Sequence, residues 1–401
     1  MDRCLVCKEA EVVRLLDFGK QALCNRFLQR ASGEEYTPEM VIAQCDACGL
    51  IQIAGPVPAT ELLPRYEWIT YKEPEDHLDE LAGAINALPG ITSRSTVAGV
   101  SFKDASTLAR LERLGVGRTW QIDPAGDLGV DAPGAGVETV QDRLTIETAT
   151  DLAEKYGHPE VVVVRHILEH AHDPLGLMEA MRALVAPDGY VVFEVPDCTR
   201  GLEGFDYSSL WEEHILYFTS ETFQRSIDTS GFERVMFKIF KYPFEDSLVT
   251  IVRPRRQGAA PLAGGDWLGA ERSRARAYSA QFTSAKASFR EFVSGHRKAD
   301  GGVALFGAGH LACTFVNLLE LDDYIDFVVD DDSRKQGLLM PGSALPIYGS
   351  DALVGRGVKL CLLGLNPDVE DKVVANNRAF VEQGGEFYSI FSVSERAVRS
   401  D

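Results

Sequence analysis

Apolar residues along this chain recur at two different spacings, and the change between them predicts alternating helices and strands. From Leu78 to Leu88 they lie three or four residues apart, which predicts a helix within residues 66–88. Four successive valines, Val161 to Val164, instead predict a strand that is buried on both faces of a parallel sheet. The chain therefore contains the two element types from which α/β folds are built.

The same patterns divide most of the remaining chain into short elements. The expected strands are residues 95–100, 119–123, 190–195, 232–240, 248–252, 303–306, 325–329 and 359–363. Further helices are expected at 106–114, 175–184, 267–297 and 310–321. Repeated strand–helix–strand order implies a doubly wound sheet, in which ligands bind beyond the carboxyl ends of the strands.

Four cysteines near the N-terminus carry the strongest chemical signal. Cys4 and Cys7 form one C-x2-C pair, and Cys45 and Cys48 form a second. Each pair presents two thiolates from one tight turn, and two such turns complete the tetrahedral sulfur site that zinc favours. Four thiols without metal are the alternative. We expect no disulfides, because no signal peptide precedes the chain.

Pattern and composition together predict an α/β protein of four segments. These are a small zinc-binding module at 1–65, a doubly wound Rossmann-like domain at 66–255, a linker and long helix at 256–298, and a second Rossmann-like domain at 299–401. A chain of this length buries a sizeable core without help from a metal, so zinc would stabilise the first module locally.

Charge and hydropathy exclude several classes of partner. Sixty acidic residues against 40 basic ones give a net charge of −20, which disfavours nucleic-acid binding because phosphate contacts need clustered Lys and Arg. No apolar run is long enough to cross a bilayer. We therefore expect a soluble cytoplasmic protein. The sequence leaves its oligomeric state open.

Polar residues stand directly after the first two strands of the larger domain. The turn after residues 95–100 contains Gly99, Ser101 and Asp104, and Asp123 ends the next strand. Main-chain amides of such a turn can approach an anionic or ribosyl group. An acid at the end of the second strand can accept hydrogen bonds from ribose hydroxyls. Capping of the following loop is the alternative role for Asp123.

Three histidines follow the valine strand, at the edge where a site is expected. His166, His170 and His172 stand there with Glu169 and Asp173. Histidine titrates near neutral pH, so it can take or give a proton under working conditions. Metal binding by His166 and His170, which lie four residues apart, is the alternative.

A further acid/base candidate is the adjacent pair Glu213 and His214. A carboxylate beside an imidazole can act as a catalytic couple if the chain bends there. The alternative is a purely structural segment that leads into the next helix, because Thr219 is a favourable N-cap residue.

The C-terminal region contains Gly307-Ala308-Gly309 between a predicted strand and a predicted helix. This is an incomplete dinucleotide-type turn. It indicates either a second ligand site or a turn in which strand and helix pack closely.

These motifs, in this order, resemble those of the three-domain S-adenosylmethionine-dependent sugar C-methyltransferases, which act on nucleotide-linked keto-sugars. The resemblance covers almost the whole chain. The matching segments are residues 4–7, 17–19, 25–27, 45–52, 165–170, 213–219, 307–309, 325–330, 335–337 and 341–342.

The resemblance implies a reaction in which a base removes a proton next to a keto group and the enolate attacks a sulfonium methyl group. His214 matches the family's base and Glu213 the acid that orients it. His170 matches a second active-site histidine, which would stabilise the enolate oxygen. The family also places a tyrosine in the site, and Tyr66 and Tyr71 are both candidates.

The resemblance further implies S-adenosylmethionine as a cofactor alongside zinc. The expected cofactor-binding residues are Gly99, Ser101, Asp104, Asp123 and His166.

The first cofactor turn departs from the family's E-x-G-x-x-x-G-like pattern. Ala98 or a neighbour replaces the acid, and Ala105 replaces the second glycine. Lys103 enters the turn, where it would repel a sulfonium or attract a phosphate. The aromatic residue that precedes the Glu-His pair, usually Tyr, is Trp211.

Three functions follow from these patterns. The first is C-methylation of a nucleotide-linked keto-sugar or a related keto compound. The second is proton transfer without cofactor, as in an epimerase or isomerase, and the third is a non-catalytic binding protein. Binding of S-adenosylmethionine separates the first from the other two.

Overall fold

The computed structural model describes residues 3–31, 34–66, 68–69, 73–130, 136–255, 266–298 and 301–398. Contacts between residues divide the chain into two compact units. Unit 1 contains Met1–Arg14, Ala43–Thr199 and Glu213–Arg272, and unit 2 contains Leu15–Ile42, Arg200–Glu212 and Ser273–Asp401. This division does not follow chain order, and the four segments read from the sequence remain a prediction.

Unit 1 is built on a six-stranded sheet. In spatial order its strands are β5 (Arg118–Gln121), β4 (Thr96–Gly99), β6 (Val161–Arg165), β7 (Tyr190–Asp197), β10 (Asp246–Pro254) and β9 (Phe232–Phe240). The strands from β5 to β7 are parallel, and β10 is antiparallel to both β7 and β9. The predicted α/β class and doubly wound sheet are confirmed.

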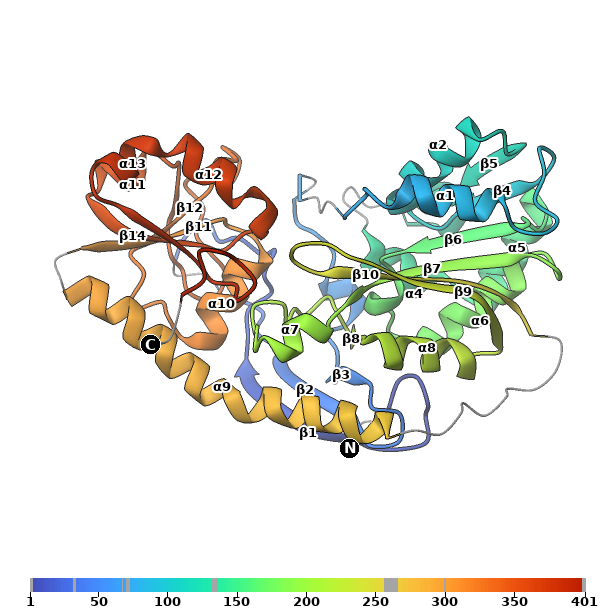
Figure 1. The fold of residues 1–401 in the computed structure, drawn as a ribbon, viewed down its shortest axis with the longest axis horizontal. Helices are drawn as coiled ribbons and strands as arrows, with labels where there is room; N and C mark the ends of the chain where they lie inside the picture. The colour runs from blue at the N-terminus through green and yellow to red at the C-terminus, as the bar shows by residue number, and fades with distance from the viewer. Residues whose placement is uncertain are drawn as a thin grey trace. The chain divides into compact units, whose positions relative to one another are not determined.

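Helices cover both faces of this sheet (Figure 1). One face carries α1 (Leu78–Asn86) and α2 (Ala105–Arg113), and the other carries α5 (Ile146–Tyr156), α6 (Pro174–Leu184) and α8 (Ser220–Thr229). Val161 and Val163 belong to the core of the first face, and Val162 and Val164 to that of the second. Because side chains alternate along a strand, a fully apolar run is required where both faces are covered.

A second, four-stranded sheet has the order β1-β2-β3-β8. Its strands are β1 (Val12–Lys20), β2 (Glu39–Cys45), β3 (Ile51–Ala54) and β8 (Leu216–Tyr217). Strand β3 pairs antiparallel with β8, with Ile51 opposite Tyr217 and Gln52 opposite Leu216. The chain just after the second cysteine pair is thereby joined to the chain just after residue 214.

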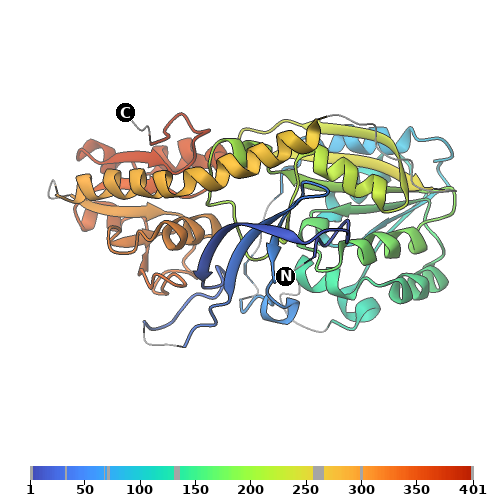
Figure 2. The same ribbon diagram turned by 90° about the horizontal axis from the view of Figure 1, so that it is seen from below.

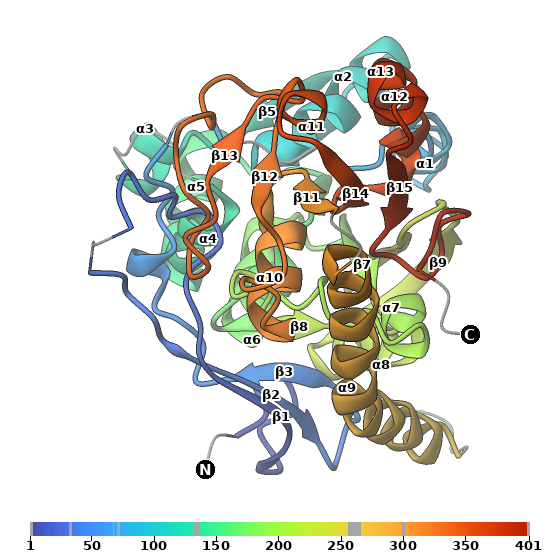
Figure 3. The ribbon, with the colours of Figure 1, turned by 90° about the vertical axis from the view of Figure 1, so that its left-hand side faces the viewer.

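Unit 2 contains a parallel five-stranded sheet (Figure 3). In spatial order its strands are β13 (Ile347–Tyr348), β12 (Phe327–Val329), β11 (Gly302–Phe306), β14 (Val358–Leu363) and β15 (Glu386–Ser389). Helix α10 (His310–Leu319) lies on one face, and α11 (Ala352–Gly355), α12 (Glu370–Asn376) and α13 (Arg378–Glu382) lie on the other. Helix α9 (Trp267–Lys298) is a single unbroken helix (Figure 2).

The remaining described helices are short. They are α3 (Pro124–Leu128), α4 (Val137–Arg143), α7 (Thr199–Glu203), and the 3-10 turns η1 (Ala59–Glu61), η2 (Phe102–Asp104), η3 (Leu168–His170) and η4 (Pro367–Val369). Among the described residues of the range 66–88, the α-helix runs from Leu78 to Asn86, because apolar periodicity begins at Leu78 and polar residues precede it. In the described part of the chain, no helix combines the length and apolarity needed to span a membrane.

Candidate active site and metal centre

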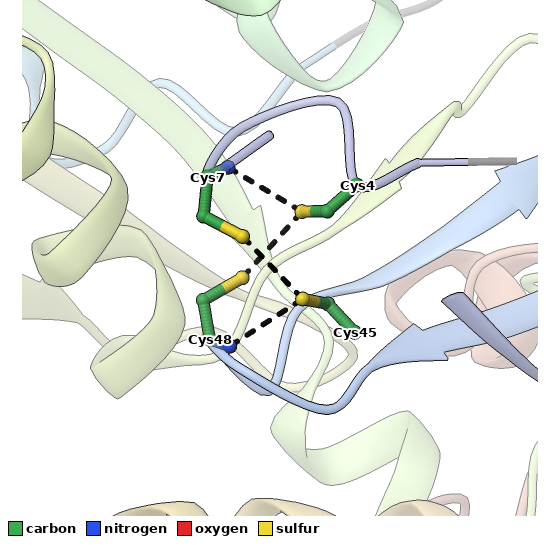
Figure 4. A group of neighbouring side chains, drawn as sticks. All are labelled: Cys4, Cys7, Cys45 and Cys48. Atoms are coloured by element: carbon green, nitrogen blue, oxygen red, sulfur yellow. Dashed lines mark hydrogen bonds between the residues drawn. The ribbon is translucent and has the colours of Figure 1, made fainter. Parts of the chain in front are cut away.

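The four predicted cysteine ligands converge in unit 1 (Figure 4). Cys4 Sγ lies 3.6 Å from Cys48 Sγ, and Cys7 Sγ lies 3.5 Å from Cys45 Sγ. Four ligands at the usual zinc–sulfur distance would place their sulfurs about 3.8 Å apart, so the thiols already have nearly the spacing of a tetrahedral site. A disulfide would require about 2 Å, and all eight cysteines are free.

Each cysteine pair is held by its own turn. The amides of Cys7 and Cys48 donate to Cys4 Sγ and Cys45 Sγ, both at 3.4 Å. Hydrogen bonding with the Cys4 and Cys45 sulfurs, together with burial, raises the pKa of the Cys48 thiol. A dication at the centre would instead favour the deprotonated thiolates. The donor set therefore fits zinc.

Arg165, the last residue of β6, forms a buried ion pair with Glu194, which lies opposite it inside β7. Arg165 Nε donates to Glu194 Oε2 at 2.5 Å, and its NH1 group donates to the main-chain oxygen of Lys103 at 2.6 Å. Burial opposes ionisation of Glu194, but His166, His77 and Arg165 hold its pKa well below the usual range. Through the Lys103 oxygen, this ion pair joins the predicted cofactor turn to the adjacent strands β6 and β7.

His166 lies at the centre of this charged region. Its backbone has φ +51°, a left-handed conformation that non-glycine residues rarely adopt. Its Nδ1 lies 3.3 Å from Glu169 Oε1, and its Nε2 lies 3.2 Å from Glu194 Oε1. Burial lowers the pKa of His166, but Glu73, Glu169 and Glu194 raise it to about 10. His166 is thus an imidazolium at neutral pH.

Lys103 does not contribute an uncompensated charge to the cofactor turn. Its buried ammonium forms an ion pair with Glu73, which also lies 3.6 Å from His166 Nδ1. Burial raises the pKa of Glu73, but His166 and Lys103 lower it to about 2. The local positive charge expected from Lys103 is therefore balanced.

The predicted cofactor turn is braced by its own side chains. Asp104 Oδ2 accepts from the amides of Val100 and Ser101 at 2.7 and 2.8 Å, and Oδ1 accepts from the Arg165 amide at 3.0 Å. A Cβ at Gly99 would lie only 2.9 Å from Asp104 Cβ, so this glycine permits close strand–helix packing. Burial raises the pKa of Asp104 to about 7, against its amide donors and Arg165. Gly99, Ser101, Asp104 and His166 thus all have structural contacts of their own.

Asp123 is placed differently, because its side chain is exposed at the carboxyl end of β5. It caps α3 by accepting from the Ala125 amide at 3.3 Å. Both roles read from the sequence, capping and an accessible carboxylate at the sheet edge, are compatible with this position.

The structure brings His170 and His214 together. Their ring centroids are 4.7 Å apart and the rings are perpendicular. A carboxylate oxygen of Glu169 and one ring nitrogen of each histidine all lie within 4.8 Å of one another. Burial, together with the neighbouring His214 and Lys103, lowers the pKa of His170 well below its usual value. His170 is therefore neutral at physiological pH, whereas His214 is partly exposed.

The other predicted residues are less clearly placed. Glu213 is buried next to His214 in the chain. The ring centroids of Tyr66 and Trp68 are 4.9 Å apart, and Tyr71 lies outside the described residues. His172 is structural, because its ring nitrogens contact the Val57 oxygen at 2.7 Å and the Gln141 side chain at 2.9 Å. The roles of Glu213, Tyr66 and Tyr71 stay predictions.

Sequence reasoning missed four members of the charged region: Glu73, His77, Arg165 and Glu194. Glu194 had a recognisable signal, because it is an acid between apolar residues inside a buried strand, where a charge requires a buried partner. Arg165, the last residue of β6, is that partner. Glu73 and His77 had no comparable signal.

We expect the change in folding stability with pH to reveal the positive charge on His166. Its raised pKa stabilises the fold fully below pH 6.5, and this contribution is lost as pH rises from 6.5 to 10. The lowered pKa of Glu73 acts oppositely, contributing above pH 4.5 and being lost as pH falls toward 2. His166→Asn, which tolerates positive φ, should lower the unfolding temperature by several degrees near pH 6 and flatten its decline toward pH 10. Thermal unfolding across this range measures both effects.

The matched control is His158→Asn, an exposed histidine whose Nδ1 lies 2.9 Å from the Leu184 oxygen. Its stability profile should parallel that of the parent protein. A parallel profile for His166→Asn as well would contradict the assignment of a buried imidazolium.

Three family models match the chain in sequence order. Residues 4–62 match a domain named for zinc binding, residues 104–236 match "Methyltransferase domain", and residues 269–391 match "C-methyltransferase C-terminal domain". Among curated proteins, the chain is 25% identical to the C-methyltransferase NovU of Streptomyces niveus, over 96% of this chain and 94% of that protein.

Solved structures give more distant matches. One is the 1,6-didemethyltoxoflavin-N1-methyltransferase of Burkholderia thailandensis, with bound 1,6-didemethyltoxoflavin and S-adenosylhomocysteine; identity is 14%, coverage is 54% of this chain and 96% of that one, and the TM-score is 0.33. Another is CalO1, a methyltransferase in calicheamicin biosynthesis in its S-adenosylhomocysteine-bound form, with 16% identity, coverage of 44% and 53%, and a TM-score of 0.30.

Proposed function

Since this chain is an S-adenosylmethionine-dependent C-methyltransferase with an N-terminal zinc-binding module, we propose that it methylates the carbon next to a keto group of a nucleotide-linked sugar. The domain matches confirm the prediction of a methyltransferase over a cofactor-free proton-transfer enzyme and over a binding protein. One observation carries the site assignment: a partly exposed His214 lies beside a buried, neutral His170 at the carboxyl edge of the sheet.

The residues of unit 1 fit the cofactor. When bound, S-adenosylmethionine supplies an electrophilic methyl group. The exposed carboxylate of Asp123 would hold the ribose hydroxyls. Glu73 neutralises Lys103, so the turn does not present a net positive charge to a sulfonium. The departures noted in the cofactor turn are therefore compatible with binding.

The two histidines divide the acid/base work. His214, which is accessible to substrate, removes the proton next to the keto group as general base. His170 is neutral, so its ring N–H can donate a hydrogen bond to the oxygen on which the enolate charge develops. A neutral donor suits this role because it stabilises the oxyanion without losing its own proton.

The substrate class and the cellular location are finer proposals. The sugar substrate follows from the motif resemblance over residues 165–170 and 213–219, and the paired histidines support a carbon acid as the reacting group. A cytoplasmic location is supported by eight free cysteines, four of them arranged as metal thiolates.

Calorimetry with S-adenosylmethionine tests the cofactor site. We expect the parent protein to bind, and Asp123→Asn to bind about tenfold more weakly because a charged acceptor for the ribose hydroxyls is lost. Asp151→Asn, which alters an exposed carboxylate on α5, should bind like the parent.

Methyl incorporation into a panel of nucleoside-diphosphate-linked keto-hexoses tests the substrate class. No binding at millimolar cofactor would refute the proposal, and binding without turnover of any keto-hexose would refute the sugar assignment.

A further inference from the structure

We infer that Glu169 is the residue that positions His214 for proton abstraction and stabilises the imidazolium formed there. This inference rests on the proposed function and deepens it. The sequence pointed only to Glu213 as the partner of the base, whereas the structure brings a second carboxylate to the same imidazole.

The main chain fixes Glu169 relative to His214. Glu169 belongs to the 3-10 turn η3, which follows β6 directly. The amide of Ile215 donates to the Glu169 main-chain oxygen at 2.8 Å. The residue after the proposed base is therefore bonded to the backbone of the acid. Pairing of β3 with β8 holds the same segment from its other side.

The two carboxylate oxygens of Glu169 have different environments. Oε1 lies 3.3 Å from His166 Nδ1, so the cationic His166 anchors one side of the group. Oε2 is buried and has no hydrogen-bond partner among the residues that the structure describes. A buried acceptor without a hydrogen-bond partner destabilises the fold, so its retention here requires an explanation. One ring nitrogen of His170 and one of His214 lie within 4.8 Å of an oxygen of this carboxylate.

The reaction gives Oε2 its partner. When the substrate C–H bond breaks, its electron pair stays on the substrate as the enolate, and the proton moves to a His214 ring nitrogen. The imidazolium carries a new positive charge, which the Glu169 carboxylate stabilises without accepting the proton. Catalytic hydrogen bonds are often long in unliganded structures and tighten in the reacting complex, so separations of up to 4.8 Å do not argue against this contact.

His170 cannot take the role of Glu169, although one of its ring nitrogens also lies within 4.8 Å of a His214 ring nitrogen. It is buried and neutral, and a second imidazolium beside His214 would be repelled. Of Glu169, His170 and His214, only the Glu169 carboxylate favours a positive charge on His214, and the charge of Glu73 acts in the same direction. The arrangement thus couples a fixed cation, His166, to a transient one through a shared acid.

Glu169→Gln keeps the shape of the side chain and removes its charge. With a keto-hexose that the parent methylates, we expect kcat to fall about 100-fold, while KM and cofactor affinity change by less than about threefold. The rate of solvent exchange at the substrate α-carbon in D2O should fall in parallel. The ascending limb of the pH–rate profile should move to lower pH by about one unit, because His214 loses its stabilising charge.

Two further variants separate positioning from folding. Glu169→Asp retains the charge on a shorter side chain. We therefore expect its kcat to lie between those of Glu169→Gln and the parent, with the ascending limb of its pH–rate profile at the same pH as in the parent. Glu179→Gln, the same change at an exposed position on α6, should match the parent throughout. If Glu169→Gln does not fold, the role of Glu169 is tested instead by comparing kcat and the ascending limb of the pH–rate profile between Glu169→Asp and the parent.

Several outcomes would overturn the assignment. One is a parent-like rate and pH limb in Glu169→Gln. Another is a second equivalent of zinc or cobalt in the parent that Glu169→Gln loses, because Glu169, His170 and His214 would then be metal ligands instead. If the parent itself neither exchanges the α-hydrogen nor methylates any keto-hexose, the proposed function fails first, and this inference fails with it.

Discussion

Replacing His214 with Asn is expected to lower methyl transfer by about 100- to 10,000-fold, because general base catalysis contributes a factor of this size. Asn is polar and of similar size but cannot take a proton near neutral pH. Cofactor binding should persist, since residue 214 is not among the predicted cofactor residues, which lie after β4, β5 and β6. Initial rates with saturating cofactor, together with α-hydrogen exchange in D2O, measure the loss directly.

The control for this variant is again His158→Asn, an exposed histidine far from the cluster in the sequence, which should retain full activity. Circular dichroism and the unfolding temperature establish that His214→Asn is folded. A rate within a fewfold of the parent value in the folded variant would remove His214 from the mechanism.

Replacing Cys45 and Cys48 with Ser is expected to release about one zinc ion per chain and to destabilise the N-terminal module severely. Structural zinc sites have apparent binding free energies of about 10–16 kcal/mol, and this energy contributes to folding. Loss of two thiolates leaves only Cys4 and Cys7 as ligands, too few for a closed tetrahedral site. Elemental analysis and thermal unfolding measure the two effects.

Activity should be lost with the metal, because the zinc module supports the catalytic segment. Strand β3 begins three residues after Cys48 and pairs with β8, and the Ile53 amide donates to the Ile215 oxygen at 2.9 Å. Cys4, Cys45 and Ile215 also belong to the same buried core cluster. Disorder in the module would therefore reach the residue next to His214.

Cys198→Ser provides the matched control, since this partly buried thiol lies outside the four-cysteine cluster. It should keep its zinc and most of its activity. Full zinc content in the double variant, or its absence from the parent protein, would refute the metal assignment.

Local patterns predicted the regular elements well. The strand expected at residues 232–240 coincides with β9, and the valine strand differs from β6 only by one residue. The long helix expected at 267–297 is α9. The spacing of apolar residues is a local property that each segment carries in its own sequence, so it can be read without knowledge of the fold.

Short or irregular elements escaped this kind of prediction. Strand β8 has only two residues, and η3 is a single turn that follows a left-handed residue, His166. Neither has enough length for a period to appear. Yet these two elements set the relative positions of His214 and Glu169.

The sequence by itself determined the zinc ligands, because two C-x2-C turns specify their chemistry within a few residues each. It also determined the α/β class and, through resemblance, the methyltransferase reaction. Only the tertiary structure decided which charges are paired: Lys103 with Glu73, and Arg165 with Glu194. The physical reason is that an ion pair or a catalytic couple depends on distance in space between segments that folding brings together, and spacing along the chain does not encode that distance.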